Sequence, residues 1–262
     1  MIINDEIISK LLKIAQKAGS AILNVYKSEF NVYTKEDKSP LTEADKQAHE
    51  IIKINLENIT PDVPILSEEG TEIDYNERSK WHLYWLIDPL DGTKEFIKKN
   101  DEFTVNIALM EYNKPVFGVV FAPVLNKIYW GGVNIGSFTK QINGRSKSIT
   151  VNPKIGDTVH VAVSRSHPSD KLTKFLSQFN KYELYSMGSS LKMCLVAEGA
   201  VDCYPRLGPT MEWDTAASHA IILGSGGDLV NYSSRNTLEY NKKNLLNPEF
   251  IACHVELVDF FR

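Results

Sequence analysis

Asp88 and Asp91 follow an apolar run, LYWLI, that is typical of a buried strand. Pro89 predicts that the strand's regular pairing ends there, and Gly92 permits an unusual turn. Such a turn can direct both carboxylates and the Leu90 carbonyl oxygen toward one point. Partly buried carboxylates repel each other unless a cation lies between them. Converging hard oxygens suit Mg²⁺, and the absence of a neighbouring His or Cys disfavours zinc.

Three further acids lie in short polar segments: Glu68 in PILSEEG, Asp214 in EWDTAA and Asp45 in SPLTEAD. Each has a plain structural explanation. Glu68 would belong to a solvated loop, Asp214 would be a helix N-terminal acid favoured by the macrodipole, and Asp45 would close a capping box. Strand-terminal acids in two neighbouring strands, together with the DPLDGT turn, nevertheless favour a metal site.

A second group of residues is suited to an anion. The segment GSSLK places Ser189 at the start of an expected helix, where backbone N–H groups favour negative charge, and Lys192 follows. Arg206 lies in YPRL, and His167 follows an expected strand in SRSH. The alternatives are a helix cap for Ser189, solvated surface charges for Lys192 and Arg206, and an ordinary loop histidine for His167.

Alternating helical and strand patterns must position these side chains. Helical spacing predicts helices over residues 7–25, 42–56, 170–179, 190–198 and 213–223, and strand patterns cover residues 64–66, 82–87, 104–110, 116–123, 128–131, 159–164 and 182–187. Strands layered between helices indicate an α/β (α+β) sandwich. A boundary near residues 154–157 divides the expected unit into residues 1–155, with most metal ligands, and 156–262, with the substrate-binding residues and Asp214.

The composition excludes some classes of partner. The 262 residues carry a formal net charge of −4 and no basic stripe, which argues against a nucleic-acid polymer but not against a small anion. Cys194, Cys203 and Cys253 form no CxxC pair and are expected to be buried thiols in a reducing compartment. The acidic N-terminus has no signal-peptide pattern, so we expect a soluble cytoplasmic protein. Peripheral contact with the inner face of the cell membrane stays open.

The ordered combination of SEE, DPLDGT and WDTAA resembles the inositol monophosphatase superfamily of Mg²⁺-dependent, lithium-sensitive phosphatases. The longer strings DPLDGTKEF and GSSLKMCLVAEGAVDCYPRLGPTMEWDTAA are similar to its bisphosphate nucleotidase branch, the CysQ type. The resemblance spans nearly the whole chain. It implies a layered αβαβα sandwich that removes the 3′-phosphate of adenosine 3′,5′-bisphosphate, and of the sulfated nucleotide, in sulfur metabolism.

The resemblance also implies roles for individual residues. Glu68, Asp88 and the Leu90 carbonyl resemble ligands of a first Mg²⁺, and Asp88, Asp91 and Asp214 resemble ligands of a second. Asp45 resembles the acid that pairs with Thr93 and helps to hold a third, weaker metal. The Thr93 hydroxyl can then relay a proton of the attacking water toward Asp45. The residues around the reacting phosphate are then Glu68, Leu90, Asp91, Gly92, Thr93 and Asp214.

The same resemblance places Ser189, Lys192 and Arg206 beside the 5′-phosphate and His167 near the nucleoside. Two alternatives stay open. An inositol monophosphatase shares the metal residues but has no second phosphate for Lys192 and Arg206 to bind. A non-catalytic sensor of nucleotide and metal would not need Thr93 or Asp45, which are both present.

Overall fold

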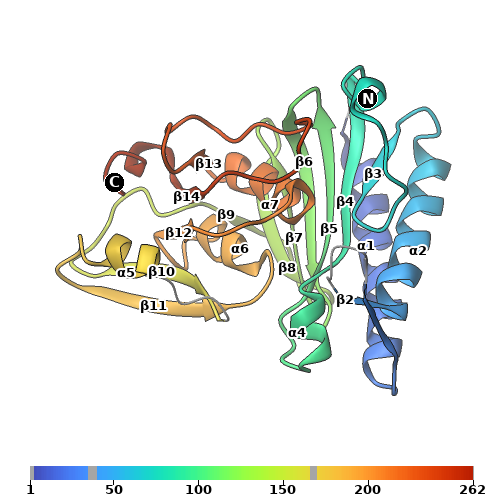
Figure 1. Cartoon of the computed structure of the whole chain (residues 1–262), viewed down its shortest axis with the longest axis horizontal. Coiled ribbons are helices and arrows are strands. Elements are labelled where there is room, and N and C mark those ends of the chain that lie inside the picture. The colour runs from blue at the N-terminus through green and yellow to red at the C-terminus, as the bar shows by residue number, and fades with distance from the viewer. Residues whose placement is uncertain (1–2, 35–39, 166–169, 262) are drawn as a thin grey trace.

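The chain folds into alternating layers of helices and sheets. The computed structural model describes residues 3–34, 40–165 and 170–261. A helix pair covers one face of a seven-stranded sheet, a second helix pair lies between this sheet and a five-stranded one, and α5 lies on the outer face of the second sheet (Figure 1). The αβαβα sandwich expected from the sequence is therefore confirmed.

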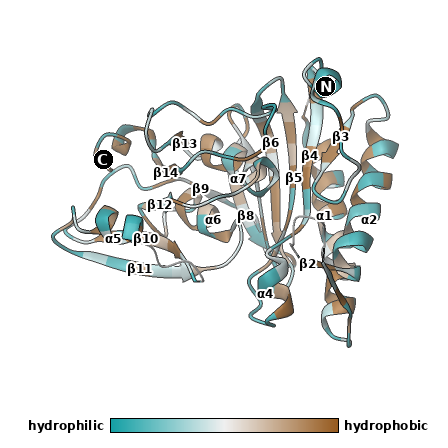
Figure 2. Cartoon of the chain, in the orientation of Figure 1, coloured by the Kyte–Doolittle hydropathy of each residue, from teal (hydrophilic) through white to brown (hydrophobic). Residues whose placement is uncertain are grey.

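The outer helix pair consists of α1 (Asp5–Tyr26) and α2 (Glu43–Ile59). The Asn4 side chain caps α1, and Thr42 and Asp45 form a reciprocal capping box at the start of α2. The apolar faces of both helices pack on the first sheet, and their polar faces point away from it (Figure 2). A two-stranded ribbon of β1 (Val32–Thr34) and β2 (Pro40–Thr42) lies between the two helices in the chain.

The seven-stranded sheet has the order β3-β4-β5-β6-β7-β8-β9. Its strands are β3 (Ile65–Ser67), β4 (Leu83–Asp91), β5 (Thr104–Glu111), β6 (Lys114–Ala122), β7 (Lys127–Gly132), β8 (Gly136–Gln141) and β9 (Lys147–Ile149). Strand β3 runs parallel to β4, and the remaining pairs are antiparallel. The central strands are buried on both faces, which explains their continuous apolar sequences.

The five-stranded sheet has the order β11-β10-β12-β14-β13. Its strands are β10 (Val159–Ser164), β11 (Tyr182–Met187), β12 (Cys203–Arg206), β13 (Gly227–Asn231) and β14 (Phe250–His254). Shorter helical elements are α3 (Tyr75–Arg78), α4 (Thr93–Ile97), α5 (Asp170–Leu176) and the 3₁₀ turn η1 (Val255–Leu257). Strands β8, β9 and β12–β14 were not expected from the sequence, because they are short or carry polar residues.

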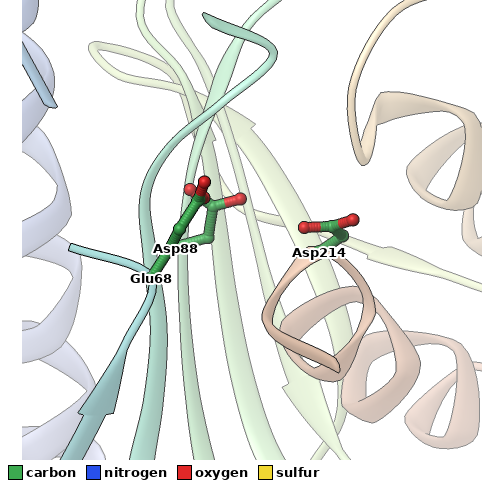
Figure 3. Close-up of side chains that lie close together, drawn as sticks. All are labelled: Glu68, Asp88 and Asp214. Carbon is green, nitrogen blue, oxygen red and sulfur yellow. The ribbon is translucent and has the colours of Figure 1, made fainter. Parts of the chain in front are cut away.

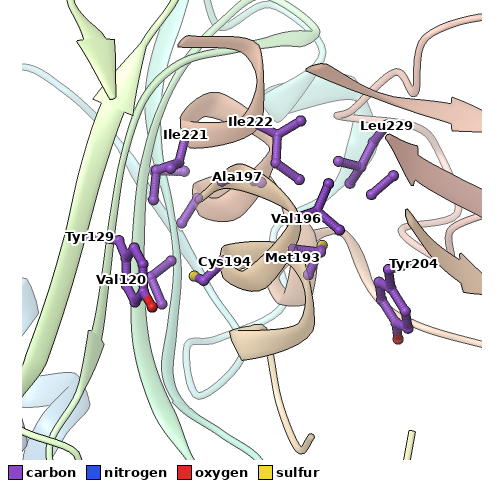
Figure 4. Packing of buried hydrophobic residues seen from close by; sticks show 14 of the residues in the cluster. Val120, Tyr129, Met193, Cys194, Val196, Ala197, Tyr204, Ile221, Ile222 and Leu229 are labelled. Carbon is purple, nitrogen blue, oxygen red and sulfur yellow. The ribbon is translucent and has the colours of Figure 1, made fainter. Parts of the chain in front are cut away.

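The middle layer consists of α6 (Leu191–Ala197) and α7 (Glu212–Gly224). One apolar cluster joins both helices to both sheets: Val120 and Tyr129 come from the first sheet and Leu229 from the second (Figure 4). The division at residues 155/156 coincides with the link between the sheets but remains a prediction, since helices of the second part complete the core of the first.

The end of β4 differs from the sequence expectation. Strand β4 continues through Pro89 to Asp91 instead of stopping at Ile87. The pairing with β5 survives because the register shifts between Asp88 and Asp91, so that the proline lies in a bulge. Gly92, with φ +91°, then makes the turn that the sequence predicted.

All three cysteines are free and buried, as expected for small core thiols. Within residues 3–34, 40–165 and 170–261, none of the helices has the length and apolar character needed to cross a bilayer.

Candidate active site

The bulge in β4 brings Asp88 and Asp91 to one face of the sheet. Residues three apart in a regular strand point to opposite faces. Here Asp88 pairs with Asn106 and Asp91 with Thr104. The step of three residues along β4 therefore lies opposite a step of only two residues along β5, and β4 contains one extra residue. The extra residue turns Asp91 to the side of Asp88, the face covered by α6 and α7, whereas Leu90 packs toward α1 and α2.

Glu68 and Asp214 complete an acidic group around Asp88. The Glu68 N–H donates to the Ile87 carbonyl oxygen at 3.2 Å, which continues the parallel pairing of β3 with β4 and puts Glu68 beside Asp88. Asp214 projects from the first turn of α7 opposite them (Figure 3). One carboxylate oxygen from each of the three lies within 4.8 Å of the other two. The structure thus brings together acids that are far apart in the sequence.

The charges of this group are unfavourable without a counter-ion. Burial, followed by the neighbouring carboxylates, raises the pKa of both Asp88 and Asp214 well above the ordinary range. Asp88 Oδ1 accepts from the Leu90 N–H at 3.1 Å, but Oδ2 is buried and has no donor among the described residues. A buried acceptor of this kind, facing two more carboxylates, fits a divalent cation with oxygen ligands.

Asp91 is linked to the start of α6. Its Oδ2 accepts from the Ser189 hydroxyl and from the Ser190 N–H, both at 2.6 Å. The neighbouring Gly188 N–H donates to Glu102 at 2.8 Å. The anion-binding groups expected at GSSLK therefore bind carboxylates of the protein itself. Ser189 does not cap the helix, since its φ is +54° and Ser190 occupies the cap position.

Asp45 and Thr93 are also brought together. The Thr93 hydroxyl lies 3.1 Å from Asp45 Oδ1 and 3.3 Å from the Leu90 carbonyl oxygen. Asp45 Oδ2 accepts from the N–H and the hydroxyl of Thr42, which holds the carboxylate in place at the start of α2. Burial raises the pKa of Asp45. The capping role and the contact with Thr93 are thus compatible, because each uses a different oxygen.

Two adjoining cavities are lined by most of the expected site residues, but Asp45 lines neither of them. The acidic cavity, about 250 Å³, is lined by Glu68, Asp88, Leu90 and Thr93 among others. The Lys192 cavity, about 120 Å³, is lined by Lys192, Arg206, Ser189 and Tyr204 among others. The two cavities share Asp91, Gly92, Glu95 and Asp214.

Lys192 is a buried cation and not the solvated surface charge that the sequence left open. Its side chain donates to the carbonyl oxygens of Met187 at 3.1 Å and Ser189 at 2.6 Å. Burial lowers its pKa to about 8, against the opposing effect of the Asp91 charge. Arg206 donates through Nη2 to the Pro209 carbonyl oxygen at 2.7 Å, and its buried Nε has no acceptor within the described chain. Both cations line a cavity that adjoins the acidic group.

His167, the residue expected near the nucleoside, lies outside the described residues.

Thr104 and Asn106 on β5 belong to the site but were not predicted from the sequence. Both contact the start of α6: the Thr104 hydroxyl lies 2.6 Å from the Ser189 hydroxyl, and Asn106 accepts a hydrogen bond from the Ser190 hydroxyl at 2.9 Å. The sequence pattern could have predicted them, because polar residues at alternate positions of an otherwise apolar strand point to the same face of the sheet.

A buried polar network behind Asp214 was also missed. His219 lies 2.9 Å from the Tyr240 hydroxyl and 2.8 Å from Asp228, and Tyr240 reaches the Thr215 hydroxyl at 3.2 Å. Thr215 follows Asp214 directly, so the network holds the first turn of α7. The participants come from distant segments, and no local pattern in the sequence connects them.

A model of the inositol monophosphatase family matches residues 3–258. This chain belongs to the inositol monophosphatase family. Membership makes it a phosphatase, and enzymes of the family depend on metal. The acidic group of Glu68, Asp88 and Asp214 is where this member can hold one.

Relatives within the family point to one branch. The 3′(2′),5′-bisphosphate nucleotidase CysQ of Salmonella typhimurium is 46% identical over 246 residues, which cover 93% of this chain and 98% of that protein. The CysQ of Haemophilus influenzae is 40% identical over 252 residues, covering 95% and 93%. The crystal structure of Bacteroides thetaiotaomicron CysQ matches with a TM-score of 0.83 at 40% identity, covering 94% of this chain and 96% of that one. The resemblance seen in the sequence is thereby confirmed.

Proposed function

We propose that this phosphatase removes the 3′-phosphate of adenosine 3′,5′-bisphosphate, giving AMP and inorganic phosphate, and acts likewise on 3′-phosphoadenylyl sulfate. The observation that carries the proposal is the buried Lys192, which lines a cavity adjoining the acidic group together with Arg206. A substrate with one phosphate needs only the acidic site, whereas a bisphosphate brings a second anion for these cations. The CysQ relatives are named for such substrates.

The reaction requires positive charge that the acidic group cannot supply. Glu68, Asp88, the Leu90 carbonyl, Asp91 and Asp214 would hold two Mg²⁺ ions, with a third, weaker one near Asp45. Bound Mg²⁺ supplies charge for the phosphate oxygens and makes water more acidic. The buried Asp88 Oδ2, which has no hydrogen-bond donor among the described residues, supports this assignment.

The residues of the chain position the attacking water. The Thr93 hydroxyl donates to Asp45, so its oxygen is free to accept a proton from a water near the acidic group. As the water oxygen bonds to phosphorus, its proton passes to Thr93 and the Thr93 proton to Asp45. The bond between phosphorus and O3′ breaks, and O3′ takes a proton from solvent. The raised pKa of Asp45 favours its role as a proton acceptor near neutral pH.

The 5′-phosphate would bind in the Lys192 cavity. Two of the three N–H bonds of Lys192 go to backbone carbonyls. Arg206 Nε has no acceptor in the described part of the chain and could donate to an anion. Ser189 would help to position both groups, because its hydroxyl donates to Asp91 and its carbonyl oxygen accepts from Lys192. His167 is proposed to lie near the nucleoside. We also place the enzyme in the cytoplasm, a reducing compartment that suits its buried free thiols, and in sulfur metabolism, where its proposed substrates occur.

Phosphate release from a substrate panel tests the proposal. The panel contains adenosine 3′,5′-bisphosphate, 3′-phosphoadenylyl sulfate, inositol 1-phosphate and fructose 1,6-bisphosphate, each with Mg²⁺ and with EDTA. We expect Mg²⁺-dependent release with the highest specificity constant for the two nucleotides. A preference for inositol phosphate would assign the chain to the alternative activity, and nucleotide binding without any phosphate release would indicate a sensor.

A further inference from the structure

Glu95 lies in the wall between the two cavities of the site. It belongs to α4 and lines both the acidic cavity and the Lys192 cavity. Its side chain runs between two glycines: a Cβ on Gly92 would lie 3.4 Å from Glu95 Oε2, and a Cβ on Gly188 would lie 2.9 Å from Glu95 Cγ. The absence of side chains at both glycines makes room for the Glu95 side chain and for the Glu102 backbone beside it.

The charges around Glu95 are mixed. Burial raises its pKa, the Asp91 charge acts in the same direction, and Lys192 and Lys98 act in the opposite one. The hydrogen bond that lowers its pKa comes from its own backbone N–H. The carboxylate therefore lies within electrostatic reach of both the acidic group and the buried lysine, and it can still accept a hydrogen bond from a ligand.

The other two carboxylates shared by the cavities already accept hydrogen bonds from the protein. Asp91 Oδ2 accepts from Ser189 and Ser190, and Asp214 Oδ2 accepts from the Met211 N–H at 2.9 Å. Both also belong to the proposed metal ligands. Glu95 lies on α4, which follows the bulged end of β4, and it is not one of the proposed metal ligands.

A nucleoside 3′,5′-bisphosphate must place its sugar at this wall. If the 3′-phosphate lies at the acidic group and the 5′-phosphate at Lys192, the ribose that joins them passes the residues common to both cavities. A carboxylate repels phosphate but accepts a hydrogen bond from a hydroxyl. The ribose has one such donor next to the 3′-phosphate, the 2′-hydroxyl.

We propose that Glu95 is a specificity-determining residue that accepts a hydrogen bond from the ribose hydroxyl beside the reacting phosphate. The inference rests on the proposed function and narrows it to ribonucleotide bisphosphates. The 2′-hydroxyl takes no part in bond breaking. Its loss removes a charge-assisted hydrogen bond and leaves a partly buried carboxylate facing the sugar without a donor.

The experiment compares adenosine 3′,5′-bisphosphate with its 2′-deoxy analogue, in the full-length enzyme with Mg²⁺. We expect wild type to have a specificity constant about 10- to 100-fold lower for the deoxy compound. In Glu95→Met, which keeps the side-chain length and removes the acceptor, the two constants should become equal because only the ribonucleotide loses activity. Glu95→Gln, which keeps one acceptor oxygen, should retain part of the difference. Glu57→Met, on the exposed side of α2, is the matched control and should behave as wild type.

The outcomes separate this inference from the function on which it rests. Wild type that hydrolyses ribo and deoxy bisphosphates equally well would overturn the role of Glu95 and leave the nucleotidase assignment intact. A Glu95→Met enzyme that loses the same factor on both substrates would likewise overturn it, since Glu95 would then only support the cavity wall. Wild type that releases no phosphate from either nucleotide would refute the proposed function itself.

Discussion

The Thr93 hydroxyl donates to Asp45 Oδ1 at 3.1 Å across 48 positions of sequence. Asp45 stands at the start of α2 and Thr93 at the start of α4, next to the bulged end of β4. Two residues from the first turns of separate helices thus meet beside the acidic group. The pair has the geometry of a proton relay, because one residue carries a mobile hydroxyl proton and the other a carboxylate whose pKa burial raises.

Replacing Thr93 by Ala should lower turnover by about 10²–10⁴-fold, the usual range for a positioned proton-transfer group. The affinity for substrate and the metal content should change little, because the mutation removes no charge. Steady-state kinetics and metal analysis check this. Thr93→Ser, which keeps the hydroxyl, is the matched control and should retain most activity. Near-normal turnover in the alanine variant would refute the relay.

Replacing Asp91 by Asn should abolish most activity without unfolding the protein. The Asn side-chain oxygen can still accept from the Ser190 N–H, so the contact with α6 survives. The charge available to a cation falls, and calorimetry should show weaker Mg²⁺ binding. The exposed Asp62→Asn serves as the control for loss of a carboxylate. Unchanged metal affinity and turnover would remove Asp91 from the metal ligands.

Replacing Asp88 by Asn should stabilise the metal-free protein while removing its response to Mg²⁺. The buried Asp88 carboxylate faces Glu68, Asp91 and Asp214, and the repulsion among them opposes folding. We expect a gain of about 0.5–2 kcal/mol in unfolding free energy, the usual size of a single stabilising substitution. Urea unfolding with EDTA and with Mg²⁺ measures both effects. A metal-free variant less stable than wild type would contradict this explanation.

Replacing Lys192 by Met should reduce the preference for adenosine 3′,5′-bisphosphate over adenosine 3′-monophosphate. Charge-assisted hydrogen bonds contribute about 1.5–3 kcal/mol, or roughly 10–150-fold in the specificity constant. Methionine keeps most of the packing of the lysine stem, and Lys13→Met on the exposed side of α1 is the control. Equal losses on both substrates would mean that Lys192 supports the fold or the metal site instead.

The pKa of Lys192 adds a pH signature to the same measurement. The ammonium is charged below about pH 8 and neutral above it. The specificity constant for the bisphosphate, relative to the monophosphate, should therefore fall as pH rises through about 8. In Lys192→Met the ratio should be flat over this range.

Lithium should inhibit the enzyme, as the family resemblance implies. Li⁺ is small and accepts oxygen ligands, so it can replace one Mg²⁺ without supplying the same charge. Inhibition should weaken when Mg²⁺ is raised and should be absent with Na⁺ or K⁺ at equal ionic strength. Activity that is indifferent to Li⁺ would contradict the proposed replacement of Mg²⁺ by Li⁺ at this site.

The sequence by itself determined the layered fold and the family. Apolar periodicity located α1, α2, α7 and most strands of the first sheet, because these elements bury continuous faces against the core. The capping box at Thr42 could be predicted from the sequence because both of its residues lie within one helical turn. The acids of SEE, DPLDGT and WDTAA identified the expected metal ligands, since each motif is local.

Only the tertiary structure decided how these residues meet. A bulge at Pro89, whose register depends on β5, turns Asp91 to the face of Asp88, and no local rule predicts that shift. The start of α6 binds Asp91 and Glu102, and the burial of Lys192 follows from the packing of α6 between two sheets. The position of Glu95 between the two cavities depends on the packing of the Gly188 backbone beside α4. Such contacts join segments from both halves of the chain, so they exist only once the complete core has formed.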